Sequence, residues 1–173
     1  VGGGPFPSEL DIDDESSPGF QMSHKGKEFG TVTQRKRRCG WFDAAALKRS
    51  AMINGLSGLC ITKLDILDGI KTLKICIGYK INNKEYNLLP LGADQVENCE
   101  PIFIDMPGWD ENTFNTKKWD ELPVNAQKYL LKLEGKIYKD EIKSTLKNIA
   151  IVKKDDIKFN IKKICENLYQ ITK

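Results

Sequence analysis

The segment that most constrains the fold is Lys74–Ile81, where apolar and polar residues alternate. This alternation predicts a β-strand with one apolar face, which we expect to be formed by Ile75, Ile77, Tyr79 and Ile81. Asn82-Asn83 follows at once, and asparagine pairs favour a tight hairpin turn. A second strand over Glu85–Leu89 would then pair with the first. The chain therefore needs a sheet, and something must cover the apolar face of that sheet.

Two predicted helices can cover the apolar face of the sheet. The spacing predicts a helix over Asp43–Asn54, with Gly55 and Gly58 near its end, and a second helix beginning at Pro123 and ending near Gly135. In the first helix Ala46, Leu47, Ala51 and Met52 are expected to be buried. Short strands are expected at Leu59–Lys63 and Glu100–Ile104, and a loop or weak helix over 11–28. Strands mixed with helices in 173 residues predict one α/β or α+β domain with a real core.

The segment Gly30–Asp43, GTVTQRKRRCGWFD, contains a row of four cations, Arg35, Lys36, Arg37 and Arg38. The flanking glycines and threonines are typical of a loop rather than a helix face. Consecutive side chains on an extended loop point to opposite sides, so two of them can converge on one anion. Guanidinium groups match carboxylate and phosphate in bidentate geometry. A solvated basic run or a nucleic-acid patch explains the same residues equally well.

The tetrapeptide TKLD, Thr62–Asp65, follows the apolar run Leu59-Cys60-Ile61, which reads as a short buried strand. Ligands of open α/β sheets bind at the carboxyl ends of strands. There the carboxylate of Asp65 can accept hydrogen bonds from N1–H and the exocyclic amine of guanine, which adenine does not offer. The stem of Lys63 can lie over the base. An ordinary strand end with a surface ion pair is the alternative interpretation.

Taken together, these segments resemble the adenylosuccinate synthetase family. The resemblance covers residues 1–134 and lies in VGGGPFPSEL (Val1–Leu10), EFGTVTQRKRRCGWFDA (Glu28–Ala44), ITKLDILDG (Ile61–Gly69), KICIGYK (Lys74–Lys80), EPIFIDMPGW (Glu100–Trp109) and LPVNAQKYLLKLE (Leu122–Glu134). It implies an α/β fold, the C-terminal portion of a P-loop NTPase-like mixed sheet with flanking helices. It also implies a GTP- and Mg²⁺-dependent ligase that joins IMP to L-aspartate in AMP biosynthesis.

The resemblance implies roles for individual residues. The loop of Thr31, Val32, Thr33, Gln34, Arg35, Lys36 and Arg37 corresponds to the mobile substrate loop that closes over aspartate. Within it, Thr33 would hold the aspartate carboxylate, Arg35 would contact IMP and aspartate, and Arg37 would contact aspartate and the GTP side. Lys63, Leu64 and Asp65 correspond to the guanine-binding segment. Val32 and Gln34 stand where a common family form has threonine and glycine, and Gln34 is costly if its site needs a positive φ.

Other parts of the family pattern are not found in this sequence. No glycine-rich phosphate loop occurs, and His24, the only histidine, lies in a polar stretch typical of an exposed loop. The catalytic groups and Mg²⁺ ligands are expected in an N-terminal half that this chain lacks, so we interpret it as an inactive C-terminal fragment. Residues 135–173 depart from the family. Their helical spacing from Ile157 to Ile171 predicts a lysine-rich helical tail, and Ser144-Thr145 is not expected to contact nucleotide.

Composition supports a cytoplasmic protein. There is no signal peptide or membrane-spanning run, the net charge is only +3, and the five cysteines show no CxxC spacing. Cys60 and Cys76 lie in apolar strand contexts and are expected to be buried thiols. The family resemblance implies a homodimer, and we expect neither nucleic acid nor membrane as a partner.

Two other functions compete with this interpretation. A basic RNA-binding module would use Arg35–Arg38, with Trp41 and Phe42 for base stacking. A permuted GTPase-like protein would use Asp105-Met106-Pro107-Gly108 as its DxxG motif and TKLD as its base-reading motif. The order of those two motifs and the absence of a Walker lysine loop argue against the GTPase.

Overall fold

The computed structural model describes residues 3–56, 58–137 and 150–152. Its elements, in chain order, are β1 (Glu9–Leu10), α1 (Pro18–Lys25), β2 (Cys39–Gly40), β3 (Phe42–Asp43), α2 (Ala44–Asn54), β4 (Cys60–Thr62), the 3-10 helix η1 (Leu64–Leu67), β5 (Thr72–Ile81), β6 (Lys84–Tyr86), α3 (Ala93–Glu97), β7 (Glu100–Pro107), the 3-10 helix η2 (Trp119–Glu121), α4 (Val124–Ile137) and β8 (Ala150–Val152).

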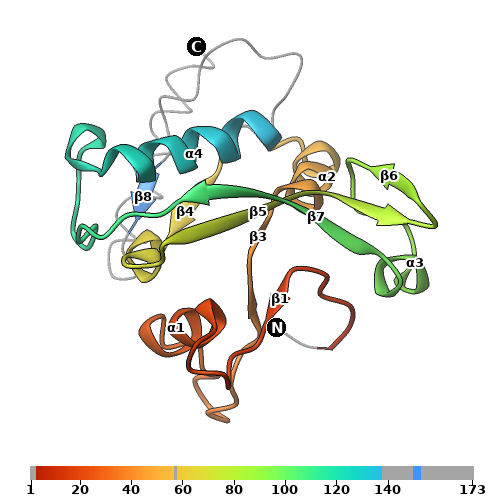
Figure 1. Ribbon diagram of the computed structural model, residues 1–173, viewed down its shortest axis with the longest axis horizontal. Coiled ribbons are helices and arrows are strands. Elements are labelled where there is room, and N and C mark those ends of the chain that lie inside the picture. The colour runs from red at the N-terminus through yellow and green to blue at the C-terminus, as the bar shows by residue number, and fades with distance from the viewer. Residues whose placement is uncertain (1–2, 57, 138–149, 153–173) are drawn as a thin grey trace.

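A mixed sheet centred on β5 organises the fold (Figure 1). β3 pairs with β5 in parallel, whereas β6 and β7 pair with it antiparallel. Two smaller pairs stand apart from it, β1 with β2 antiparallel and β4 with β8 parallel. In the view of Figure 1, α2 and α4 lie above β5 and β7, and α1 and β1 lie below them. The predicted α/β class with a mixed sheet and flanking helices is confirmed.

The β5–β6 hairpin forms where the sequence predicts it. Asn82 and Asn83 both have positive φ, 49° and 63°, as a tight two-residue hairpin turn requires, and Ile81 pairs with Lys84 across it. Asparagine tolerates this conformation better than most residues. β6 is shorter than the expected Glu85–Leu89, whereas β7 extends the expected Glu100–Ile104 by three residues to Pro107.

A bulge in β5 overturns part of the predicted strand pattern. The register with β7 slips between Cys76 and Gly78, which places an extra residue in β5. Before the bulge, Leu73 and Ile75 point into the main core, and Ile77 packs against it. After the bulge, Tyr79 and Ile81 join Cys76 in a second apolar cluster. The prediction that Ile75, Ile77, Tyr79 and Ile81 share one face is therefore wrong for the last two.

Helix α2 begins and ends as predicted. The Asp43 Oδ1 accepts a hydrogen bond from the backbone N–H of Ala46 at 2.9 Å, and Gly55 ends the helix with φ 59°. Its buried face is formed by Ala44, Ala45 and Ala51. Met52 is 65% exposed, so its predicted burial is wrong. The residue after Ala51 is rotated about 100° around the helix, away from the face that packs.

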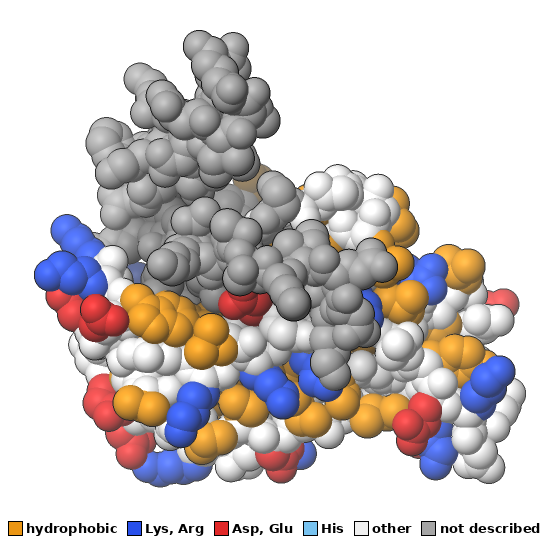
Figure 2. Space-filling view, turned by 90° about the horizontal axis from the view of Figure 1, so that it is seen from above, with side chains coloured by type: hydrophobic (Ala, Val, Ile, Leu, Met, Phe, Trp, Pro, Cys, Tyr) orange, Lys and Arg blue, Asp and Glu red, His pale blue; other side chains and the backbone are white. Residues whose placement is uncertain are grey.

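Helix α4 completes the main core. Its residues Ala126, Leu130 and Leu133 are at most 2% exposed, and α4 packs against α2. It ends at Ile137, two residues beyond the expected Gly135. On the side that faces the viewer in Figure 2, basic and acidic side chains are interspersed, with no broad patch of one sign.

Residues 11–28 contain both predicted possibilities, a loop followed by a short helix. The Ser17 hydroxyl caps α1 by accepting from the N–H of Gly19 at 3.1 Å, and Pro18 occupies the first turn. The Gln21 side chain donates to the carbonyls of Ile66 and Asp68, at 2.8 and 3.0 Å. Helix α1 therefore holds η1, the turn that contains Asp65.

Strand β4 forms at the expected position, but it is not buried. Cys60 and Thr62 are exposed, so the prediction of a buried Cys60 thiol is wrong, whereas Cys76 is fully buried as predicted. Ile61, between them, packs against the main core, so only one face of this short strand is covered.

The predictions for the tail fall mostly outside the described residues. Ser144-Thr145 and the helical spacing from Ile157 to Ile171 lie there, so those predictions stay predictions. Residues 150–152 are described, and they form β8. Within the described ranges, no helix has the length and apolarity needed to cross a lipid bilayer.

Candidate functional site

The basic segment forms a tight loop. Phe29 and Lys36 make an antiparallel bridge, the Gly30 N–H donates to the Arg35 carbonyl at 2.8 Å, and the Gln34 N–H donates to the Gly30 carbonyl at 3.0 Å. Gln34 has φ 53°, a conformation in which glycine is preferred. Gln34 therefore occupies the strained position of the turn.

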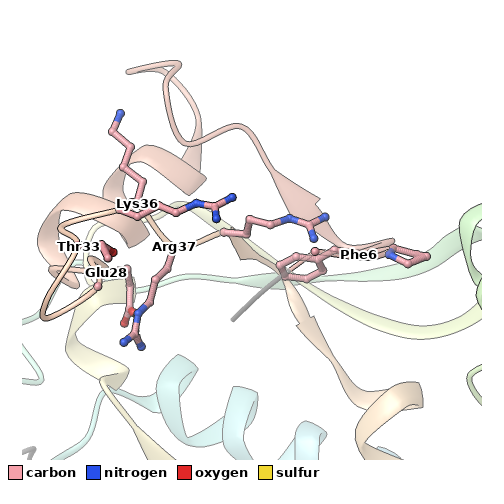
Figure 3. Close-up of a pocket in the computed structure, with 10 residues that line it drawn as sticks. Phe6, Glu28, Thr33, Lys36 and Arg37 are labelled. Atoms are coloured by element: carbon pink, nitrogen blue, oxygen red, sulfur yellow. The ribbon is translucent and has the colours of Figure 1, made fainter.

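A cavity of about 640 Å³ opens between this loop and the N-terminal turn, as Figure 3 shows. Its lining residues are Gly3, Pro5, Phe6, Glu28, Gly30, Thr33, Arg35, Lys36, Arg37 and Arg38. In Figure 3 the side chains of Lys36 and Arg37 run in opposite directions, as expected of neighbours on an extended loop. Arg37 points to the same side as Glu28. The lining thus combines four cations with one acidic residue.

Arg38 fixes the N-terminal wall of the cavity. Its guanidinium donates to both carboxylate oxygens of Glu9, at 2.6 and 2.5 Å, and to the Gly4 carbonyl at 2.7 Å. It also lies 5.2 Å from the centre of the Phe6 ring. The hydrogen bonds from Arg38 hold the pKa of Glu9 below its ordinary value and raise the pKa of Arg38 itself. Arg38 therefore has a structural role, since its guanidinium holds the N-terminal segment and is not free to bind a substrate.

The other three cations differ in how strongly they are engaged. Lys36 pairs with Asp13 on the exposed side of the loop. Arg37 lies 4.0 Å from Glu28, a loose pairing, and its enclosed Nε has no hydrogen-bond partner among the described residues. For the exposed side chain of Arg35, the described part of the chain offers neither an ion pair nor a hydrogen bond. Arg35 and Arg37 are therefore the cations of the cavity that remain available to an anion.

The second predicted segment follows the carboxyl end of β4, which pairs in parallel with β8. Lys63 adopts the left-handed conformation, with φ 56° and ψ 37°. Such a conformation costs a lysine on the order of 1 kcal/mol, and side-chain contacts must hold it. The Lys63 Nζ donates to the Gly26 carbonyl at 2.6 Å and to the carboxylate of Glu28. Glu28 therefore contacts both predicted segments.

The structure separates the predicted site residues into three groups. Thr33, Arg35, Lys36 and Arg37 line the cavity, whereas Thr31, Val32 and Gln34 form the exposed turn beyond its lining. Lys63, Leu64 and Asp65 lie outside the lining. Leu64 is 3% exposed and belongs to the main core, so its side chain is not available to a ligand. Asp65 is half-buried at the start of η1, and no described residue pairs with its carboxylate.

Sequence reasoning missed two parts of this site. Glu28 had no predicted role, although an acidic residue beside a row of four cations is a signal that it neutralises one of them. The N-terminal segment was not predicted to take part, and Gly3, Pro5 and Phe6 form one wall of the cavity. The contacts of Glu28 with Lys63 and of Arg38 with Phe6 and Glu9 cannot be read from local spacing, because each joins residues more than twenty positions apart.

Comparison with known proteins assigns the chain to a family. The sequence model of the adenylosuccinate synthetase family matches residues 1–149. The chain belongs to the adenylosuccinate synthetase family. Over 135 residues it is 68% identical to the adenylosuccinate synthetase of Methylobacillus flagellatus, a match that covers 78% of this chain and 31% of the relative. Over 134 residues it is 67% identical to the chloroplastic adenylosuccinate synthetase 1 of Ricinus communis, with 78% and 30% covered.

A solved structure gives the same result. The fully ligated adenylosuccinate synthetase from Plasmodium falciparum superimposes with a TM-score of 0.72 at 35% identity, over 79% of this chain and 32% of that one. The chain therefore spans about a third of the length of the synthetases that it matches and carries the fold of that third.

The structure argues against both competing functions, the RNA-binding module and the permuted GTPase-like protein. Trp41 is 8% exposed within the main core, so its ring is not available to stack on RNA bases. The N–H of Gly108 donates to the Lys71 carbonyl at 2.8 Å, and a Cβ at Gly108 would lie 1.6 Å from the Ile70 carbonyl oxygen. The DxxG-like segment is thus the end of β7 and the tightly packed residue after it, and the amide that would sense a phosphate is already engaged.

Trp109 anchors that segment. Its Nε1 donates to the Asp68 Oδ1 at 2.6 Å, and its carbonyl accepts from the Gly69 N–H at 2.8 Å. Asp68 also accepts from the backbone and hydroxyl of Thr113, at 2.9 and 2.8 Å. These bonds hold the segment after η1 in place against the residues that follow β7.

Proposed function

We propose that this chain provides the dicarboxylate- and guanine-binding third of an adenylosuccinate synthetase, a ligase that joins IMP to L-aspartate with GTP in AMP biosynthesis. The observation that carries the proposal is the cavity in which Arg35 and Arg37 remain available while Arg38 and Lys36 are committed to Glu9 and Asp13. Two guanidinium groups with a nearby hydroxyl suit the two carboxylates of aspartate.

Each available group has a proposed role. Arg35, which has no described partner, contacts the aspartate carboxylate and the IMP side. Arg37 contacts aspartate and the GTP side. The hydroxyl of Thr33, on the cavity wall, donates to a carboxylate oxygen. Thr31, Val32 and Gln34 shape the turn that carries these groups, and Lys36 holds the outer edge of the loop through Asp13.

The guanine end of the site is proposed to lie at Lys63, Leu64 and Asp65. The carboxylate of Asp65 is half-buried and has no described partner, so it can accept from N1–H and the exocyclic amine of guanine. Asp65 is held in place because α1 and Asp68 fix both sides of η1. The side chain of Leu64 lies in the main core and holds this segment against it.

Magnesium is the cofactor expected with GTP. The described residues contain no group of three or more His, Cys, Asp or Glu side chains placed to bind a metal ion. This part of the chain therefore does not fit a Mg²⁺ site, and we assign no Mg²⁺ ligand and no metal-dependent step to it. A homodimer and a cytoplasmic location are proposed from the family alone. Among the described cysteines no disulfide forms, which is compatible with a reducing compartment.

A chimeric enzyme tests the proposed function. Residues 1–134 of this chain would replace the matching third of the Methylobacillus flagellatus synthetase, and adenylosuccinate formation would be followed with GTP, IMP, aspartate and Mg²⁺. We expect turnover, because the two sequences are 68% identical over this region. A chimera that is folded but inactive would refute the proposal.

The 173-residue polypeptide by itself is the matched control in that assay. We expect it to give no adenylosuccinate, because its sequence contains no phosphate-binding loop. Measurable product from the polypeptide alone would contradict the assignment of catalytic groups outside these residues.

A further inference from the structure

Glu28 is the only acidic residue among those that line the cavity in the described part of the chain. Its side chain is 24% exposed, and its two carboxylate oxygens face different cations. One oxygen accepts from the Lys63 Nζ, and the other lies 4.0 Å from the Nη1 of Arg37. A carboxylate beside a guanidinium competes with any anionic ligand for that guanidinium.

Lys63 decides the outcome of this competition. Its Nζ also donates to the Gly26 carbonyl at 2.6 Å, and its own backbone is fixed in the left-handed conformation at the end of β4. The ammonium group is thus held at a defined place between β4 and the start of the basic loop. Glu28 is drawn toward it and kept at 4.0 Å from Arg37, beyond the usual 2.7–2.9 Å of a charge-assisted hydrogen bond.

We propose that Lys63 is a positioning residue for the anion loop: it clamps Glu28 and so keeps the guanidinium of Arg37 available to the ligand. This inference rests on the proposed function of the cavity and adds a second role to a residue assigned so far only to the nucleotide. Through Glu28, the segment assigned to the guanine base controls the affinity of the loop for a dicarboxylate.

The clamp predicts a coupling between Lys63 and Glu28 that simple electrostatics does not predict. Lys63→Met removes the partner of Glu28, whose carboxylate then closes on Arg37 and withdraws it from the cavity. Aspartate binding should weaken. Adding Glu28→Gln removes the competitor and should restore binding to the level of Glu28→Gln alone. A lysine that acted only through its charge would instead weaken aspartate binding by the same factor whether or not Glu28 is present.

The experiment uses the complete 173-residue chain, labelled with ¹⁵N, and L-aspartate as the probe. Binding is followed by NMR at the amides of Gly30 and Arg35. We expect Lys63→Met to weaken binding about threefold to fivefold, the scale of one partly exposed charge pair. Glu28→Gln alone should bind at least as tightly as wild type, and the double variant should match Glu28→Gln within about twofold.

Lys71→Met is the control, because Lys71 pairs with Asp110 away from the cavity lining and should leave aspartate affinity unchanged. Thermal melting of each variant verifies folding. The proposal is overturned if Lys63→Met binds as wild type does, if Lys63→Met weakens binding as much in the Glu28→Gln background as in the wild type, or if Glu28→Gln weakens binding.

A ligand-free measurement separates this inference from the proposed function. The exchange of the Arg37 Nε–H with water should slow in Lys63→Met, as Glu28 closes on the guanidinium, and return to the wild-type rate in the double variant. If the wild-type chain shows no saturable aspartate binding, the dicarboxylate role of the loop in this chain fails, and the exchange rates alone decide the clamp. Unchanged exchange in Lys63→Met would overturn it.

Discussion

The Nζ of Lys63 donates to the carboxylate of Glu28, which stands 35 positions earlier in the chain. This contact joins the turn after β4 to the first residues of the basic loop. Because Glu28 also faces Arg37, two segments that are separate in sequence share one set of charges. A change at Glu28 or Lys63 should therefore affect the basic loop, the segment after β4 and the nearby thiol of Cys39 together.

Cys39 can report on this set of charges. Burial raises the pKa of its thiol, the charge of Glu28 raises it further, and the charge of Lys63 lowers it. Glu28→Gln should therefore lower the pKa of Cys39, and Lys63→Met should raise it. The measurement is the pH dependence of alkylation at the Cys39 peptide, read by mass spectrometry. Cys60, whose pKa is raised by burial alone, is the internal control and should respond to neither change.

The Glu9–Arg38 pair should give a pH-dependent contribution to stability. The pKa of Glu9 is lowered in the folded protein, first by its hydrogen bond with Arg38, so the folded state favours the ionised form. That stabilisation is fully present above the ordinary pKa of 4.5 and is lost as the pH falls through the lower folded value. The pair is more than a third exposed, so the effect is small.

Urea unfolding of wild type and Glu9→Gln from pH 3 to 7 measures this contribution. The difference between their free energies of unfolding should be constant above about pH 5 and should shrink on acidification. A difference that grows as the pH falls would contradict the assigned direction.

Sequence patterns predicted the parts of the fold that depend on local chemistry. The capping carboxylate of Asp43, the αL glycine at 55 and the Asn82-Asn83 turn each specify a boundary within a few residues, and α2, β5 and β6 begin or end there. The face of β5 beyond Gly78 was not predictable in this way. The bulge depends on how β7 pairs with β5, and that partner lies more than twenty residues further along the chain.

The candidate site shows the same division. The types of residue in the basic loop indicated anion binding, and Thr33, Arg35 and Arg37 line the cavity. The sequence did not reveal which charged groups are committed to one another, because Glu9 and Asp13 reach the loop, and Lys63 reaches Glu28, through tertiary contacts. The roles of the individual residues in binding stay predictions.

Asp43 should contribute more to stability than an ordinary helix cap. Its Oδ1 caps α2, and its Oδ2 accepts from the hydroxyl of Tyr79, which is fully buried and whose pKa is raised by burial and by this carboxylate. Asp43→Ala should cost about 2–3 kcal/mol, because it removes the cap and leaves a buried hydroxyl without a partner.

Tyr79→Phe provides the matching half of a double-mutant cycle and should cost about 1 kcal/mol. The double variant should be less destabilised than the sum of the single ones, since both lose the same hydrogen bond. Strictly additive free energies of unfolding would show that the bond contributes nothing.

Asp65 should discriminate between purine bases in the chimeric enzyme described above. Asp65→Asn should weaken GTP binding by more than about tenfold, because the charge-assisted hydrogen bonds to guanine are lost. ATP cannot make these bonds, so its weaker binding should not change. Calorimetric titration with both nucleotides gives the comparison, and an equal loss for GTP and ATP would remove the guanine assignment.

The most direct test of the account is the aspartate KM of Arg35→Ala in the same chimera, measured together with its melting temperature. Arg35 is exposed and has no described partner, so the account predicts a KM raised by about tenfold or more and a melting temperature within about 2 °C of the parent. An unchanged KM in a fully folded variant would contradict the claim that this loop binds the dicarboxylate.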